Sequence, residues 1–121
     1  MAKEKSQLFN VFAYGSLTDP QFVERLIGRV IRMVPAKLKG YKRLKLPEKK
    51  YPLAIKDAHS IIHGKLLINL NLQDLRRIEK WEETTEDLYK EIKINVETKE
   101  GKKEALVYVW NEGEFHESKI K

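Results

Sequence analysis

Two places in the sequence could carry chemistry: a short glycine-containing loop and one glutamate. The loop, Tyr14-Gly15-Ser16-Leu17, follows an apolar run and precedes a helix start. A glycine here lets successive backbone N–H groups point into one concavity, which binds a carboxylate or phosphate without a charged side chain. An ordinary strand-to-helix turn would use the same residues. Ser16 is a weak nucleophile candidate, because no Gly-x-Ser-x-Gly elbow surrounds it.

Glu79 is singled out by helical periodicity. At about 100° per residue it falls between Leu72 and Leu75 on the apolar stripe of its helix, so its carboxyl group is expected to point at the core. Such a group pairs with a buried cation, caps a backbone donor, or sits desolvated with a raised pKa, as general acid–base catalysis near neutral pH requires. A helix-end glutamate that reaches solvent or pairs with an arginine fits the same spacing.

Other reactive side chains give weaker signals. Tyr89 and Tyr108 could hydrogen-bond a ligand, although strand tyrosines are more often packing residues. His59, His63 and His116 are too scattered for metal-ligand spacing, and the absence of cysteine excludes disulfides, thiolate metal sites and a cysteine nucleophile. No phosphate-binding or dinucleotide motif occurs. We therefore expect no metal and no cofactor.

The elements that must position these residues begin with a strand, a tight loop and a helix. Leu8 to Tyr14 is an apolar run typical of a buried strand. Thr18 or Asp19 can cap a helix that starts at Pro20 and ends at Gly28. The loop is thereby predicted to join the strand to the helix.

The middle of the chain alternates basic and apolar residues. Arg29 to Leu46 predicts strand segments joined by turns around Pro35 and Gly40. Two more strands are expected at Tyr51 to Ile55 and Ile61 to Ile68, with residues 57–60 between them.

A second helix and a final pair of strands complete the pattern. Asn71 can cap a helix that runs to about Trp81, with an aspartate three residues later near its positive end. Glu82 to Asp87 should be an exposed acidic loop. Alternating residues then lead to a turn at Lys99 to Lys102 and an apolar strand at Ala105 to Trp110.

Six or seven short strands with two helices predict an α+β fold. We expect a small, mixed, mostly antiparallel β-barrel with two flanking helices, because the strands are too closely spaced for a doubly wound parallel sheet. A chain of 121 residues is the size of one domain. The prediction is a single domain over 1–121, with its core at about 8–110 and a polar C-terminal tail.

Composition narrows the class of protein. With 41% hydrophobic and 35% charged residues the chain is neither disordered nor membrane-spanning. We expect a cytoplasmic protein, because cysteine is absent and no signal-peptide pattern opens the chain. The abundance of lysine, glutamate and arginine also suits a heat-stable protein.

The net charge of +6 is uneven, because residues 1–60 carry 13 basic and 5 acidic side chains. Its densest part could meet nucleic acid or an anionic substrate, although a solvated face is the favoured interpretation. The basic residues of this stretch are Lys37, Lys39, Lys42, Arg43, Lys45, Lys49 and Lys50.

Taken together, the residues resemble the γ-glutamylcyclotransferase-like family, including its AIG2-like and γ-glutamylamine cyclotransferase branches. The resemblance covers about residues 8–110 and rests on a spaced pattern rather than one long motif. The pattern comprises Tyr14-Gly15-Ser16-Leu17, Tyr51-Pro52-Leu53-Ala54, the strand with Gly64, the segment Leu75 to Glu79, Tyr89, and Val107-Tyr108.

The resemblance implies a small barrel with a cavity at one end and no cofactor. In that family the loop matching Tyr14 to Leu17 holds the α-carboxylate end of a γ-glutamyl group through backbone N–H groups. Glu79 matches the proton acceptor, which deprotonates the α-amine as it attacks the γ-carbonyl, giving 5-oxoproline and a free amine or amino acid. Tyr89 and Tyr108 match pocket tyrosines.

Three departures from the family pattern affect specificity. Arg76 and Lys80 stand where the family usually has an aspartate and a glycine, and the acidic loop before Tyr89 is lengthened. The expected partner is a small γ-glutamyl substrate handled by a monomer or homodimer, with no membrane and no nucleic acid. One alternative is a non-enzymatic module that binds a small carboxylate or RNA. Another is a protein with the family fold that has lost activity.

Overall fold

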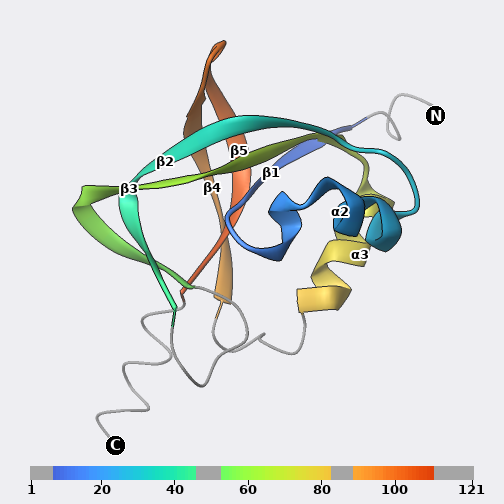
Figure 1. Cartoon of the computed structure of the whole chain (residues 1–121), viewed down its shortest axis with the longest axis horizontal. Coiled ribbons are helices and arrows are strands. Elements are labelled where there is room, and N and C mark those ends of the chain that lie inside the picture. The colour runs from blue at the N-terminus through green and yellow to red at the C-terminus, as the bar shows by residue number, and fades with distance from the viewer. Residues whose placement is uncertain (1–6, 46–52, 83–88, 111–121) are drawn as a thin grey trace, which may run out of the picture.

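The computed structural model describes residues 7–45, 53–82 and 89–110, and in these residues five strands close into a barrel (Figure 1). Around the barrel the strand order is β1-β3-β2-β4-β5. The strands are β1 (Phe9–Ala13), β2 (Arg32–Leu44), β3 (Leu53–Leu70), β4 (Tyr89–Thr98) and β5 (Gly101–Trp110). The polar C-terminal tail and most of the acidic loop lie outside the described residues.

The barrel is mixed, as predicted. Neighbouring strands pair antiparallel except β1 and β5, which pair parallel with Val11 opposite Leu106. That parallel pair closes the sheet on itself and leaves no open edge between the first and last strands. With two helices outside the barrel, the α+β class predicted from the sequence is confirmed.

Two predicted turns in the first basic stretch are wrong, because β2 is one strand of 13 residues. The chain passes Gly40 by a register shift between Lys39 and Tyr41, and Gly40 has a φ of +87°. An irregularity of this kind bends a strand without ending it. Pro35 lies within the strand opposite Lys65 of β3, whereas the pairing with β4 is at Lys37.

The prediction of two strands at 51–55 and 61–68 is also wrong. Their described residues belong to β3, an 18-residue strand that includes 57–60. Inside it, an Oδ1 of Asp57 accepts a hydrogen bond from the His59 backbone N–H at 3.1 Å. Figure 1 shows β2 and β3 curving together around the barrel. Long curved strands therefore replace the six or seven short ones expected.

The first helix agrees with its capping signals. A single 3-10 turn, η1 (Ser16–Thr18), leads into α2 (Pro20–Ile27). The Asp19 side chain accepts a hydrogen bond from the Gln21 N–H at 3.0 Å, and Gly28 ends the helix in the left-handed region.

The second helix, α3 (Leu72–Glu82), is capped by two reciprocal hydrogen bonds. Asn71 Oδ1 accepts from the Asp74 N–H at 2.8 Å, and Asp74 Oδ2 accepts from the Asn71 N–H at 3.0 Å. Two arginines then tie α3 to the end of α2: Arg29 pairs with Asp74 at 2.5 Å, and Arg77 donates to the carbonyl of Ile27. These bonds fix the position of α3 against α2.

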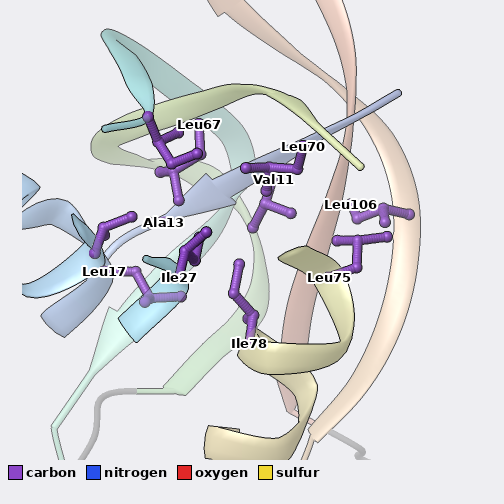
Figure 2. Close-up of a cluster of buried hydrophobic side chains, with 11 residues drawn as sticks. Val11, Ala13, Leu17, Ile27, Leu67, Leu70, Leu75, Ile78 and Leu106 are labelled. Atoms are coloured by element: carbon purple, nitrogen blue, oxygen red, sulfur yellow. The ribbon is translucent and has the colours of Figure 1, made fainter. Parts of the chain in front are cut away.

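Two apolar clusters hold the layers together. The first fills the barrel interior and comprises Phe12, Ala36, Leu38, Tyr41, Ala54, Ile62, Leu66, Val96, Ala105, Val107 and Val109. The second lies between the barrel and the helices and comprises Val11, Ala13, Leu17, Val23, Ile27, Ile31, Leu67, Leu70, Leu75, Ile78 and Leu106. Figure 2 shows side chains of this helix-barrel cluster converging from strands, loop and helices. Alternate residues of β1 thus serve different cores.

Within the described ranges, no helix has both the length and the apolar character needed to cross a lipid bilayer.

Two strands approach each other closely at Gly64, next to the start of the Tyr14 loop. A Cβ at this position would lie 2.1 Å from the carbonyl oxygen of Ala13 and 2.9 Å from the Phe12 ring. Since Ala13 is the last residue of β1, Gly64 helps to set where the Tyr14 loop begins.

Replacing Gly64 with alanine is expected to destabilise the protein by about 3 kcal/mol, because a backbone atom of β1 would have to move. Chemical denaturation followed by circular dichroism measures this. Gly40→Ala is the matched control: nothing lies within 4 Å of the place its methyl group would take, so only its positive φ adds a cost, of about 1–2 kcal/mol. Equal stability of the two variants would contradict the close-approach explanation.

Candidate functional site

The Tyr14 to Leu17 loop is a turn in which the first three carbonyls accept hydrogen bonds. The Gly15 carbonyl accepts from the Thr18 backbone N–H at 3.0 Å and from the Thr18 hydroxyl at 2.6 Å. The Ser16 carbonyl accepts from the Asp19 N–H at 3.2 Å. The opening N–H groups of such a turn have no acceptor within the turn itself, so the loop presents donors. Backbone donors at the start of a turn can bind an anion.

Tyr14 anchors the loop from two sides. Its hydroxyl donates to the backbone carbonyl of Tyr108 on β5 at 2.5 Å. Its own carbonyl accepts from Nε of Arg43, at the end of β2, at 2.9 Å. The ring also stacks near Phe12, with centroids 6.3 Å apart. Tyr14 therefore joins three strands where β1 ends.

Glu79 is exposed, so the prediction that its carboxyl group points at the core is wrong. The buried face of α3 is made by Asp74, Leu75 and Ile78, whereas Leu72 is 53% exposed. At about 100° per residue this face is centred well away from Glu79. Periodicity misplaced the carboxyl group because Leu72 was counted as a core residue. The solvent-exposed alternative stated for this side chain holds.

Exposure does not separate Glu79 from the loop. Ile78, its neighbour in α3, is fully buried in the same cluster as Leu17, the last residue of the loop. Figure 2 shows the Leu17, Ile27 and Ile78 side chains gathered on one side of β1. Leu17 and Ile78 belong to one continuous cluster of buried side chains, so the loop and the Glu79 turn of α3 border the same core.

A second carboxylate, Glu91, lies near Glu79. Partial burial raises the pKa of Glu91, and the negative charge of Glu79 raises it further. Glu91 stands opposite Tyr108 in the β4–β5 ladder, and the Tyr108 carbonyl is the one that accepts from Tyr14. Glu79, Glu91, Tyr108 and Tyr14 therefore form a continuous series of neighbours.

The structure describes the side-chain surroundings of Tyr108, and of Tyr89 only the backbone. Tyr108 is half-buried against the helix-barrel cluster, beside the Tyr14 anchor. Tyr89 begins β4, two residues before Glu91, with its backbone paired to Trp110. Their roles as ligand contacts remain predictions.

Two pockets lined by described residues lie elsewhere on the barrel. One, of about 250 Å³, is lined by β1, β4 and β5 residues with Asn10 among them, and the other, of about 280 Å³, lies around Lys37 and His63. Among the described residues, no group of three or more histidine, aspartate or glutamate side chains could hold a metal ion.

Part of the basic stretch is paired with acids on the barrel surface. Lys39 contacts Glu97 at 2.9 Å, and Lys42 contacts Asp57 at 3.9 Å. A hydrogen bond from Lys39 lowers the pKa of Glu97. These pairs fit the interpretation of a solvated face, and the expectation that nucleic acid is not a partner remains a prediction.

Arg43 and Glu91 were not predicted from the sequence as site residues. Arg43 appeared only as one cation among seven in a basic stretch, and no local pattern shows that its side chain reaches the Tyr14 loop. Glu91 continues the polar face of an alternating strand. Its proximity to Glu79 depends on how α3 packs, which the spacing of these residues does not reveal.

Replacing Glu91 with glutamine is expected to stabilise the protein slightly at pH 7, by less than about 1 kcal/mol because the group is exposed. Its pKa is raised in the folded state above the ordinary value of 4.5. Ionisation therefore opposes folding, and this cost is present above the folded pKa and vanishes below the unfolded one.

Urea unfolding of Glu91→Gln at pH 7 and at pH 3 measures the difference, with the exposed Glu100→Gln as control. The gain should appear only at pH 7 and only for Glu91→Gln. A gain of the same size at pH 3 would show that charge repulsion near Glu79 is not its cause.

Comparison with known proteins adds a family match. Residues 11–121 match the family model described as Gamma-glutamyl cyclotransferase, AIG2-like. The chain is similar to AIG2-like protein B of Arabidopsis thaliana, with 31% identity over 111 residues that cover 90% of this chain and 63% of that protein. The chain thus spans less than two thirds of the length of this relative.

Solved structures share the fold. A solution structure from Arabidopsis thaliana matches with a TM-score of 0.76 and 28% identity, covering 86% of this chain and 62% of the other. A structure named Gamma-glutamyl cyclotransferase matches with a TM-score of 0.72, covering 87% and 68% of the two chains. Identity to the latter is 17%, so that likeness shows the fold alone.

Proposed function

This chain belongs to the Gamma-glutamyl cyclotransferase, AIG2-like family, and we propose that it releases 5-oxoproline from a γ-glutamyl amine or small γ-glutamyl peptide. The observation that supports this most is that Leu17 and Ile78 belong to one cluster of buried side chains. The loop and the helix turn that carries Glu79 therefore border one core, which is consistent with a site shared by the two. A carboxylate binder and a proton acceptor near each other are what the reaction needs.

In the proposed reaction the substrate supplies both reacting groups. The α-amine attacks the γ-carbonyl carbon, a five-membered ring closes, and the C–N bond to the leaving amine breaks. Glu79 takes the proton that the attacking nitrogen loses and returns it to the departing nitrogen. Because nucleophile and electrophile belong to one molecule, the protein mainly has to fold the substrate and move one proton.

Glu79 does not need a permanently buried site to act as the base. A bound substrate would cover this exposed side chain and remove water from it during the reaction. Glu91 supplies a second negative charge nearby, as the raised pKa of Glu91 indicates.

The Tyr14 to Leu17 loop would hold the α-carboxylate of the γ-glutamyl group. Its first three carbonyls accept hydrogen bonds from Arg43, Thr18 and Asp19, and in the proposal its N–H groups are the donors offered to the ligand. Preorganised donors of this kind bind a negative charge without reorganising when it arrives. With the carboxylate held there, the α-amine of the same substrate is placed toward α3.

The direct test is an assay of 5-oxoproline with a panel of γ-glutamyl amines and γ-glutamyl dipeptides. Product should form with at least one of them, and Glu79→Gln should lower kcat by about 10² to 10⁴, because the amide cannot accept the proton. KM should change less than kcat. Mass spectrometry of the product follows the reaction without a coupled enzyme.

Glu24→Gln is the matched control, because Glu24 is an exposed glutamate on the other helix and should leave kcat unchanged. Thermal unfolding of both variants establishes that they are folded. Full activity in Glu79→Gln would remove Glu79 as the base. No product from any compound in the panel would overturn the proposed function itself.

A further inference from the structure

Arg43 places a positive charge directly on the candidate binding loop. It lies near the C-terminal end of β2 and is exposed, yet its Nε donates to the Tyr14 carbonyl at 2.9 Å. The two residues are 29 positions apart in sequence. One guanidinium hydrogen bond to the first residue of the loop holds the head group at the loop rather than in bulk solvent.

Arg43 differs from other basic residues of the barrel surface in having no ion pair with the residues that the structure describes. Lys42 pairs with Asp57, Lys39 with Glu97, and Arg29 with Asp74. Within residues 7–45, 53–82 and 89–110, no carboxylate lies at ion-pair distance from Arg43. This cation is therefore oriented by a neutral carbonyl, and its charge has no acidic partner in the described part of the protein.

A guanidinium anchored through Nε retains its best anion-binding geometry. Nε supplies one of its five N–H donors, and the other four are on the two terminal nitrogens. Paired N–H groups of this kind match the two oxygens of a carboxylate, and such charge-assisted bonds are stronger than neutral ones. The hydrogen bond to Tyr14 keeps these paired donors at the same loop that is proposed to bind the carboxylate.

We propose that Arg43 is a specificity residue that binds the α-carboxylate of the γ-glutamyl substrate together with the Tyr14 to Leu17 loop. This inference rests on the proposed function and adds one charged side chain to its carboxylate site. The preferred substrates carry a free α-carboxylate, and those in which it is an α-carboxamide are poor. Arg43 takes no part in proton transfer and selects the substrate by charge.

The test compares two substrates that differ only at the α-carbon: a γ-glutamyl anilide with a free α-carboxylate and the same compound as its α-carboxamide. The wild-type protein should prefer the carboxylate. Arg43→Ala should lower kcat/KM for the carboxylate substrate by about 10- to 100-fold and leave the amide substrate nearly unchanged. Arg43→Lys should recover part of the preference, because it keeps the charge without the paired geometry.

The amide substrate distinguishes two roles of Arg43: binding the carboxylate and supporting the Tyr14 loop. If Arg43 only held the Tyr14 carbonyl in place, its removal would slow both substrates by the same factor. Lys42→Ala is the matched control: it removes a positive charge from the adjacent position, and the preference should persist. An unchanged carboxylate preference in Arg43→Ala, or an equal loss with both substrates, would overturn the proposal.

Failure of the proposed function would look different. In that case neither substrate would yield a cyclised product with the wild-type protein. Binding of 5-oxoproline and of its amide, measured by calorimetry, then tests Arg43 independently. Tighter binding of the carboxylate that is lost in Arg43→Ala supports the assignment, and equal binding of both compounds by the wild-type protein, or no binding at all, contradicts it.

Discussion

The candidate site depends on the two hydrogen bonds that fix Tyr14 at the end of β1. The chain leaves β1 here and must cross from the barrel to the helices that cover it. The hydroxyl of Tyr14 is bonded to β5 and its carbonyl to a side chain of β2. These two bonds fix Tyr14 at both ends, and in the turn that follows the carbonyls of Gly15 and Ser16 accept from Thr18 and Asp19.

The position of Glu79 is fixed by the apolar packing of its neighbours and not by burial of its own carboxylate. The Glu79 carboxylate is exposed, but the residue before it is locked in the helix-barrel cluster with Leu17. Arg29 and Arg77 fix α3 to the end of α2, so this helix turn cannot drift from the loop without breaking buried contacts. A base can thus stay accessible to substrate while its backbone is held rigidly, which suits a group that must exchange protons.

Local signals predicted the helices well because their ends are decided locally. The Asp19 cap, the Gly28 stop and the reciprocal bonds of Asn71 and Asp74 satisfy backbone groups within a few residues of each other. The strands were harder to predict, since Gly40 can end a strand or bend it. Only pairing with distant β3 decides between these outcomes.

The site shows the same division between local and long-range information. The loop and Glu79 were predicted from the sequence as site residues, but the choice between a buried and an exposed Glu79 was left open, because it depends on which side of α3 meets the barrel. The parts played by Arg43 and Glu91 depend on neighbours that are 29 and 12 residues away in sequence. Such neighbours are set by closure of the barrel and by helix packing.

The proposed reaction requires the Tyr14 to Leu17 loop and Glu79 to contact one ligand. The most direct measurement is a nuclear magnetic resonance titration with 5-oxoproline, following the backbone amides and the glutamate side-chain carboxyl carbons. The amides of Gly15, Ser16 and Leu17 and the carboxyl carbon of Glu79 should shift together, with one dissociation constant. Shifts confined to the hollow around Lys37 and His63, or no saturable shifts at all, would contradict this claim.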